Sequence, residues 1–287
     1  MINIIDIGSN TIRLVTYDRG NPVSNFGATS EIISDTKNGI LSKKGIDKLC
    51  NTISGLLKNK ENEEVYAFGT YAVRVLRNKN EVKSEVLKRT GVDIDILSGK
   101  KEAEYDFYGL LSTISARESG IGVDLGGGSA QILVFEEGRL SASASRPIGS
   151  KRVKSKFSRG RTVTKAERTE IRKYIKTNLE IYKGKKADKI YMMGGTAKTA
   201  LRLCRFLEGR NADIIKISEI ERLIQFTEEA DEAILKKVLR NRYDNIAAGI
   251  VIMEEIAQFF GAKSIHIKRC GVRDGYVARL EEQKKEA

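Results

Sequence analysis

The 287-residue sequence is poor in several residue types on which whole classes of function depend. It has one histidine, His266, and three widely separated cysteines, Cys50, Cys204 and Cys270. This composition excludes a disulfide framework, a paired-cysteine metal site and the usual zinc constellations. His266 lies in an alternating, strand-like segment, so we expect a structural role for it, and we expect ordinary thiols at the cysteines.

Long apolar runs are missing as well. The longest, Ile246 to Met253, is far shorter than the roughly 20 residues of a membrane-spanning helix. The N-terminus has no basic leader, and Asp6 interrupts its apolar stretch, which excludes a secretory signal. With only two prolines, a proline-rich linker is not expected. The sequence therefore predicts a cytoplasmic protein without a membrane partner.

Positive charge, by contrast, is in excess: 51 Lys and Arg against 38 Asp and Glu give a formal net charge of +13. Such an excess favours polyanionic partners, which include nucleic acid, anionic lipid and polyphosphorylated small molecules. No aromatic-rich RNA platform or zinc finger indicates a specific nucleic-acid interface. One run of six cations is either a track for a polyanion or only a solvated face: Lys151, Arg152, Lys154, Lys156, Arg159 and Arg161.

An internal repeat is the most informative feature. Residues 5–20 recur as residues 123–138, with a constant offset of 118 from Asp6 to Asp124 and from Gly20 to Gly138. Each copy is typical of an apolar strand, a tight glycine loop, a second strand and a hairpin turn. Glycine and hydroxyl residues in such a loop let main-chain amides approach an anion closely.

The repeat therefore predicts two phosphate loops. Asp6 and Asp124 are candidate Mg²⁺ contacts, direct or through water, although such a carboxylate can also accept hydrogen bonds from its own turn. No P-loop or dinucleotide-binding glycine motif is present. The candidate phosphate-binding residues are Gly8, Ser9, Asn10 and Thr11 in the first copy and Gly126, Gly127, Gly128 and Ser129 in the second.

The two copies predict two α/β domains, residues 1–117 and 118–287, with a cleft between the loops and a hinge at Glu118-Ser119-Gly120. The last helix could return to the first domain. Helical spacing of apolar residues, two candidate capping boxes and short apolar runs predict further elements. These are helices near 46–56 and 171–182, boxes at Thr164/Glu167 and Ser218/Glu221, and strands at 65–68, 94–97, 189–193 and 264–268.

Paired Asp-containing loops in duplicated halves resemble the superfold of acetate and sugar kinases, heat-shock ATPases and actin. Within it, the sequence is similar to the exopolyphosphatase and guanosine pentaphosphate phosphohydrolase family, in a short form without the helical C-terminal module of longer members. Eight matching segments, each unspecific alone, occur in order along nearly the whole chain. They are 6–11, 69–74 with Asn78, 98–103, 124–129, 147–150, 194–197, 242–244 with 248–249, and 273–275.

The resemblance implies Mg²⁺-dependent release of the terminal phosphate of inorganic polyphosphate, or of the 5′-phosphate of guanosine pentaphosphate. It assigns the general base to Glu102, in a helix that Ser98 could cap, and phosphate contact to Arg74. On helical spacing, Glu102 is expected to lie off the buried stripe. Where the family has a second catalytic glutamate, this chain has Gln131, whose amide cannot accept a proton.

Three functions stay open on this reading. The first is a phosphohydrolase acting on polyphosphate or guanosine pentaphosphate. The second is a weakly active or inactive module that binds polyphosphate or an alarmone such as guanosine tetraphosphate. The third is an ATP-dependent kinase or ATPase with Gly194-Gly195-Thr196 near the adenosine. The oligomeric state stays open too, a homodimer included.

Overall fold

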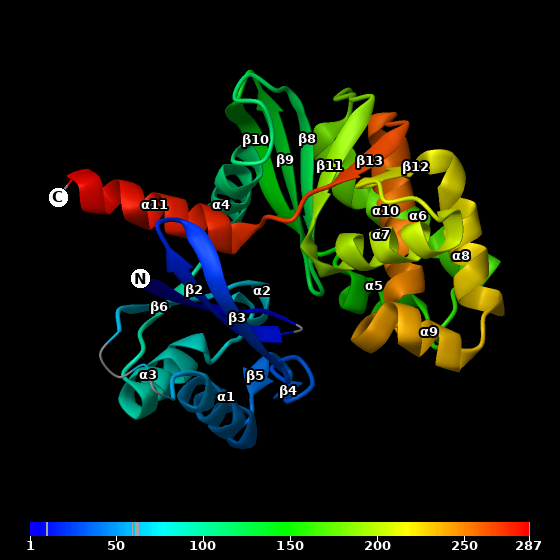
Figure 1. The fold of residues 1–287 in the computed structure, drawn as a ribbon. Helices are drawn as coiled ribbons and strands as arrows, with labels where there is room; N and C mark the ends of the chain where they lie inside the picture. The colour runs from blue at the N-terminus through cyan, green and yellow to red at the C-terminus, as the bar shows by residue number, and fades with distance from the viewer. Residues whose placement is uncertain (10, 59, 61–62, 287) are drawn as a thin grey trace. The chain divides into compact units, whose positions relative to one another are not determined.

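The structure is a computed structural model that describes residues 1–9, 11–58, 60 and 63–286 (Figure 1). The chain divides into two compact units, which are described separately below. Leu110–Gly271 form unit 2, whereas Met1–Gly109 and the C-terminal segment from Val272 form unit 1.

The observed division lies at 109/110, earlier than the predicted 117/118. Leu110, near the end of helix α4 (Gly99–Leu111), already packs against Gly122 in unit 2. Glu118, in the segment predicted as a hinge, pairs with Lys189 at 3.0 Å inside unit 2, so this segment is not a boundary. Helix α11 (Val272–Glu286) contacts strand β1 (Ile2–Ile7), which makes the end of the chain part of unit 1.

Unit 1 is built on a five-stranded sheet of order β3-β2-β1-β6-β7, in which β1 pairs antiparallel with β2 and parallel with β6. The other strands of the unit are β2 (Thr11–Asp18), β3 (Asn21–Thr29), β6 (Val65–Gly69) and β7 (Ile94–Ile96), with a small ladder of β4 (Thr36–Lys37) and β5 (Ile40–Leu41). Its further helices are α1 (Lys43–Leu56), α2 (Tyr71–Arg74) and α3 (Lys79–Thr90).

Both faces of this sheet are covered, as a parallel sheet centre requires. Successive side chains of β1 point to opposite faces, so Ile5 joins the core under α1 and α3 while Ile4 joins a second core with Tyr276 of α11. Figure 1 shows α1 and α3 on one side of the strands and α11 on the other. Burial on both faces explains why β1 carries isoleucine on both of its sides, at four of its six positions.

Unit 2 repeats this plan in a six-stranded sheet of order β10-β9-β8-β11-β13-β12. Its strands are β8 (Gly120–Leu125), β9 (Ala130–Glu136), β10 (Arg139–Arg146), β11 (Lys189–Met193), β12 (Ile214–Lys216) and β13 (Ser264–Ile267). Its helices are α5 (Ser150–Phe157), α6 (Lys165–Leu179), α7 (Gly194–Glu208), α8 (Ile220–Glu229), α9 (Glu232–Leu239) and α10 (Ile246–Phe260), with 3₁₀ turns at Glu180–Tyr182, Ile217–Glu219 and Arg240–Arg242.

The predicted strands correspond to β6, β7, β11 and β13, and the predicted helices to α1 and α6. Thr164 caps α6 as expected: the Thr164 amide donates to Glu167 Oε2 at 2.8 Å, and the Glu167 amide donates to Thr164 Oγ1 at 3.3 Å. The second capping box is wrong. Helix α8 begins at Ile220, and Glu219 instead accepts the amide of Lys216 at 2.9 Å, because a 3₁₀ turn precedes the helix.

Two findings concern the features that the sequence excluded, a membrane-spanning helix and a disulfide framework. No helix in the described part of the chain is both long and apolar enough to cross a bilayer. The three cysteines are buried, and no disulfide joins them in the described part of the chain. The sulfur of Cys270 contacts Met193, a packing role like that of a small apolar residue.

Candidate functional site

The two predicted phosphate loops have the same turn. In unit 1 the amide of Gly8 donates to the carbonyl of Thr11 at 3.1 Å, and in unit 2 the amide of Gly126 donates to the carbonyl of Ser129 at 3.0 Å. Ser9 and Ser129 are both buried. Asn10 lies outside the described residues. Each loop thus turns sharply between two antiparallel strands and brings its backbone to the end of the sheet, as an anion site needs.

The agreement extends to the far end of each hairpin. Arg19 and Gly20 have φ angles of 48° and 74°, and their repeat partners Glu137 and Gly138 have φ angles of 49° and 72°. Two successive left-handed residues form the tight turn that matches strand twist. The repeat seen in the sequence is therefore a repeated hairpin with matching backbone geometry.

The start of helix α5 supports the loop of unit 2. The amides of Ser150 and Arg152 donate to the carbonyls of Gly126 and Gly127, each at 3.0 Å. Gly149 touches the loop so closely that a Cβ there would lie 2.5 Å from the Gly127 carbonyl carbon. These bonds occupy loop carbonyl oxygens, which would otherwise repel an anion.

Gln131 lies beside this loop and orders one of its hydroxyls. Its side chain is 1% exposed, and its Nε2 donates to Ser129 Oγ at 3.1 Å and to Ser145 Oγ at 3.2 Å. Because the Ser129 oxygen accepts the amide proton, the Ser129 hydroxyl proton can be donated elsewhere. Gln131 therefore positions Ser129 as a hydrogen-bond donor.

Asp124 lies at the end of β8, paired across the ladder with Gln131 and against the first residue of α7. A Cβ on Gly194 would lie 2.4 Å from Asp124 Oδ1, and the φ of Gly194 is +90°. Only glycine suits both conditions. The carboxylate of Asp124 is thus held at the N-terminus of a helix, where a negative charge is favourable.

Two cations gather near the same loop. The guanidinium of Arg242 lies over Gly195, since a Cβ on that glycine would be 2.1 Å from Arg242 Nη2. Burial lowers the pKa of the Lys151 ammonium, and the charge of Arg242 lowers it further. Two like charges held together without full hydration favour binding of an anion. Arg242 lies in one of the segments matched to the family, the signal that could have identified it.

In unit 1 the equivalent carboxylate has cationic neighbours. Asp6 pairs across the β1–β2 ladder with Arg13, and Arg273 Nη1 lies 3.5 Å from Asp6 Oδ2. Burial lowers the pKa of Arg13, the charge of Arg273 lowers it further, and Asp6 acts in the opposite direction. Sequence reasoning missed Arg13, although it occupies the repeat position of Gln131.

The segment 273–275 brings Arg273 to this place. The Tyr17 hydroxyl donates to Asp274 Oδ1 at 3.1 Å, and burial, followed by the charge of Asp274, raises the pKa of that phenol. Gly275 lies against α4, where a Cβ would come within 1.8 Å of the Tyr105 carbonyl oxygen. These contacts fix the start of α11 to both β2 and α4.

Arg74 and Glu102, predicted separately, meet in unit 1. Arg74 Nη1 donates to Glu102 Oε2 at 2.5 Å and to the Leu97 carbonyl at 2.9 Å. Ser98 Oγ accepts the amide of Lys101 at 3.1 Å, so Ser98 caps α4 as expected and places Glu102 in its first turn. Glu102 is only 6% exposed, so the expectation that it lies off the buried stripe is wrong. The guanidinium supplies the partner that a buried carboxylate needs.

The predicted polyanion track is not a single row. Four of its six cations lie on α5, and at 100° per residue Lys151 and Lys154 share one side while Arg152 and Lys156 share another. Lys156 Nζ lies 4.1 Å from the centre of the Tyr174 ring, a cation–π contact. Arg159 and Arg161 follow the end of the helix. Helical winding separates charges that are adjacent in sequence.

The side chains around the two loops could meet the needs of a magnesium ion only in part. Within the described residues, no three His, Cys, Asp or Glu side chains gather into a metal cage. Mg²⁺ beside phosphate needs only one or two carboxylates, because phosphate oxygens and water complete the octahedron. Asp124 and Asp6 stay the candidates for this role, and Arg273 Nη1 lies 3.5 Å from Asp6 Oδ2.

Two α/β units that repeat one strand–loop–strand hairpin define a protein of the duplicated actin-like ATPase fold, the predicted class. The model of the Ppx/GppA phosphatase family matches residues 32–284, and the chain belongs to this family. The family places the protein among the hydrolases that act on phosphoric anhydrides.

Individual relatives agree with the family. Exopolyphosphatase 1 of Mycobacterium leprae is 25% identical over 303 residues, which cover 97% of this chain and 88% of that protein. A guanosine-5′-triphosphate,3′-diphosphate pyrophosphatase of Photobacterium profundum is 30% identical over 87 residues, 30% of this chain and 18% of that protein. The crystal structure of the Aquifex aeolicus Ppx/GppA family member has a TM-score of 0.81 at 20% identity, covering 99% of this chain and 98% of that one.

Proposed function

We propose that this protein is a Mg²⁺-dependent exopolyphosphatase that releases orthophosphate from the end of inorganic polyphosphate, with Glu102 as general base. The observation that carries the proposal is the buried Arg74–Glu102 pair in the first turn of α4. A carboxylate withdrawn from bulk water and held in place by an arginine is suited to orient and deprotonate a single water molecule.

The reaction assigns a proton and a bond to each participant. Glu102 Oε1 or Oε2 accepts one proton from the attacking water, whose oxygen forms a bond to the terminal phosphorus. The bond from that phosphorus to the bridging oxygen breaks, so orthophosphate leaves and the shortened chain keeps the bridging oxygen. Phosphoryl transfer otherwise depends on positioning and on neutralising charge. Arg74 supplies a fixed positive charge beside the base.

The phosphate loop of unit 2 supplies donors for phosphate oxygens. Its carbonyls are occupied by α5, and Gln131 leaves the proton of the Ser129 hydroxyl available. Lys151 and Arg242 add positive charge nearby. A bound Mg²⁺ would neutralise charge on the phosphates, and Asp124 is the residue of this unit that would hold it.

Inorganic polyphosphate is favoured over guanosine pentaphosphate by two observations. The net charge of +13 suits a long polyanion better than a single nucleotide. The similarity to an exopolyphosphatase extends over 97% of the chain, against 30% for the pyrophosphatase of guanosine nucleotides.

A second candidate, a weakly active polyphosphate-binding module, rests on Gln131. Its Nε2 donates to two serines, and a neutral amide does not take a proton from water. In that case the loops would bind polyphosphate but turnover would be slow.

The test measures orthophosphate release from polyphosphates of graded length and from guanosine pentaphosphate, with Mg²⁺ and with chelator. We expect release from polyphosphate that requires the metal. Glu102→Gln should lower kcat by a factor of roughly 100 or more, the usual range for loss of a general base. Glu104→Gln, two residues along the same helix, is the matched control and should stay within about twofold of the wild type.

Other outcomes would contradict the assigned base or favour a different function. Unchanged turnover in Glu102→Gln would contradict the assigned base. Tight polyphosphate binding with no phosphate release would establish the binding module. Activity that needs a nucleotide and ignores polyphosphate would instead favour a kinase or ATPase.

A further inference from the structure

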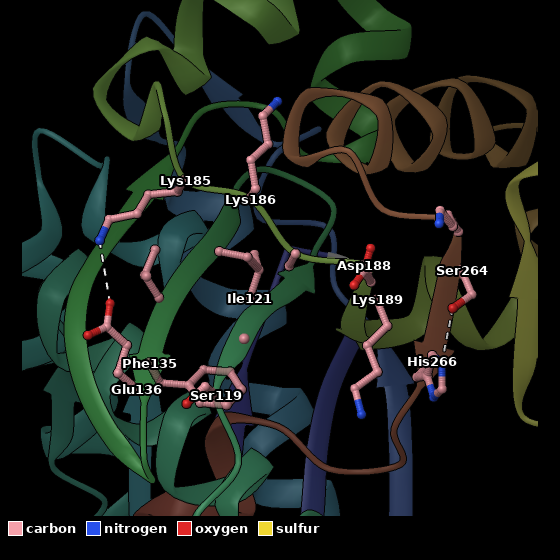
Figure 2. Close-up of a pocket in the computed structure, with 14 residues that line it drawn as sticks. Ser119, Ile121, Phe135, Glu136, Lys185, Lys186, Asp188, Lys189, Ser264 and His266 are labelled. Atoms are coloured by element: carbon pink, nitrogen blue, oxygen red, sulfur yellow. Dashed lines mark hydrogen bonds and ion pairs between the residues drawn. The ribbon is translucent and has the colours of Figure 1, made fainter.

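A pocket in unit 2 lies at the edge of the sheet opposite to the phosphate loop. Its volume is about 580 Å³, and it is lined by the first residues of β8, β11 and β13 and the last residues of β9 (Figure 2). The phosphate loop follows the other end of β8, after Leu125. The pocket is therefore separate from the candidate site described above, and none of the predicted site residues lines it.

Lysine is the dominant charged residue of this pocket. Lys185 and Lys186 lie in the loop that leads into β11, Lys189 is the first residue of β11, and Lys263 directly precedes β13. Parallel pairing of β11 with β13 places Lys189 opposite Ser264 and so joins the two segments at one edge. The amide of Lys263 donates to the carbonyl of Asp188 at 2.8 Å, which fixes the two loops to each other.

These lysines are incompletely neutralised. Lys185 Nζ lies 3.5 Å from Glu136 Oε1, a contact marked by a dashed line in Figure 2, and Lys189 pairs with Glu118 at 3.0 Å. Lys186 Nζ donates to the Phe259 carbonyl at 3.1 Å. Among the ion pairs of the described residues, those of the pocket lysines involve Lys185 and Lys189.

The charge balance of the lining is positive. Of the residues that line the pocket, four are lysines, whereas Glu136 and Asp188 are the acidic ones. Ammonium groups on flexible stems act as separate point charges, unlike the fork of an arginine that grips one phosphate. Such an arrangement suits an anion whose charge is spread along a chain.

The aromatic side chains of the pocket argue against nucleotides and nucleic acids. Binding of single strands uses exposed rings on which bases stack. Phe135 in the lining is 1% exposed, and its neighbour Tyr191 is 4% exposed. Neither offers a free ring face for a base.

We infer that this lysine-lined pocket binds a segment of an inorganic polyphosphate chain at a second site, distinct from the phosphate loop. The choice of an inorganic chain rests on the proposed function, while the presence of an anion site rests on the pocket itself. A chain bound here would be retained by unit 2 independently of its hydrolysis.

The pKa of the single histidine of the protein can be used to detect binding of an anion in this pocket. His266 lines the pocket, and its Nε2 lies 3.1 Å from Ser264 Oγ. Burial lowers the pKa of His266, the charges of Lys189 and Lys268 lower it further, and Glu118 opposes them. A bound polyanion would offset the lysine charges, so binding should raise this pKa.

The experiment follows the imidazole proton resonance of His266 by NMR, in the untagged full chain carrying Glu102→Gln to prevent turnover. With one histidine in the sequence, the resonance needs no assignment. The pH titration is repeated with polyphosphate of about 15 units, with orthophosphate at matched ionic strength, and with a single-stranded DNA oligonucleotide.

The comparison variants remove charge without removing His266. Lys185→Ala/Lys263→Ala lacks two pocket lysines, and Lys173→Ala, an exposed lysine of α6, is the control. We expect polyphosphate to raise the pKa of His266 in the parent and the control. The double variant should need about tenfold more polyphosphate for the same shift, from two weak charge contacts. Circular dichroism verifies that each variant is folded.

Three results would overturn the inference: no change of the His266 pKa with polyphosphate, an equal change in the double variant, or a larger response to DNA. The two proposals fail separately. If wild-type protein hydrolyses polyphosphate but His266 does not respond, the pocket inference is wrong and the proposed function stands. If His266 responds but wild-type protein releases no phosphate, the proposed function is wrong and the pocket inference stands.

Discussion

The phosphate loops of the two units have the same backbone and different surroundings. Gly8 and Gly126 close equivalent turns with equivalent amide-to-carbonyl bonds, and the hairpin ends agree within a few degrees of φ. The residue across the ladder from the leading aspartate differs, being Arg13 in unit 1 and Gln131 in unit 2. The repeat therefore supplies the same glycine turn twice, while the residue across the ladder sets the local charge.

This difference separates two roles for the aspartates. Asp6 has Arg13 and Arg273 as neighbours, and we propose that it holds these cations beside its loop. Asp124 has a neutral amide and a glycine as neighbours and remains suited to a metal. The two aspartates hold the same position in the fold but differ in their surroundings. Asp6 lies beside protein cations and Asp124 beside a neutral amide, and such neighbours determine what a carboxylate can bind.

The largest effect is expected from Gly149→Ala, which disrupts the support that the start of α5 gives to the loop of unit 2. The new Cβ would lie 2.5 Å from backbone atoms of the loop, which should cost about 2 kcal/mol of unfolding free energy by overpacking. Phosphate release should fall with it. Urea unfolding measures the first and a phosphate assay the second.

Gly55→Ala is the matched control for this substitution. A Cβ on Gly55 would meet nothing within 4 Å, and the residue lies inside α1, so alanine should stabilise the protein by about 0.5–1 kcal/mol. If Gly149→Ala were as stable and active as the wild type, the support of the loop by α5 would have no energetic role.

Arg13→Gln makes the ladder pair of unit 1 resemble that of unit 2. It removes a cation next to the loop of unit 1, and we expect polyphosphate to bind about fivefold more weakly. Calorimetry in the Glu102→Gln background measures the affinity. Arg139→Gln, an exposed arginine at the start of β10, is the control. Equal affinities of the two variants would show that Arg13 serves Asp6 and not the ligand.

Gln131→Glu tests the pair in unit 2. A carboxylate would accept the Ser129 proton that the glutamine leaves available, and its negative charge would repel phosphate. We expect KM for polyphosphate to rise about threefold, with kcat within about twofold of wild type. Steady-state kinetics separate the two constants. A large gain in kcat would instead mean that a carboxylate is missing from the native site.

The smallest expected effect is the pH dependence of protein stability that arises from His266. Burial and two lysines lower the pKa of His266 below its ordinary 6.5, so the folded protein disfavours its charged form. Its contribution to stability is present in full above pH 6.5 and is lost as the pH falls towards the lower pKa of the folded state. Urea midpoints at about pH 7.5 and 6 should differ slightly in wild type and less in His266→Gln. An unchanged difference in that variant would assign the slope to another group.

Local features of the fold were predictable from the sequence. The offset of 118 residues indicated both hairpins, and Thr164 with Glu167 indicated the start of α6. Ser218 misled because a 3₁₀ turn intervenes before α8. Such signals act over a few residues, where hydrogen bonding and side-chain period dominate.

The candidate site was predictable in its parts but not in its pairings. Glu102 and Arg74 were both expected, yet their mutual contact brings together residues 28 positions apart. Arg273 was a matched residue without a role until α11 placed it beside Asp6. The lysine pocket had no motif, because its lysines come from two segments far apart in the chain, one at the start of β11 and one before β13.

The sequence by itself determined the duplicated glycine turns and the excess of positive charge, since both follow from residue type and short-range spacing. Only the tertiary structure decided which charges meet. It placed Arg273 on Asp6, Arg242 over Gly195 and Glu102 in a buried contact with Arg74. The physical reason is that charge–charge interaction and burial depend on distance in space, and packing of strands and helices sets that distance.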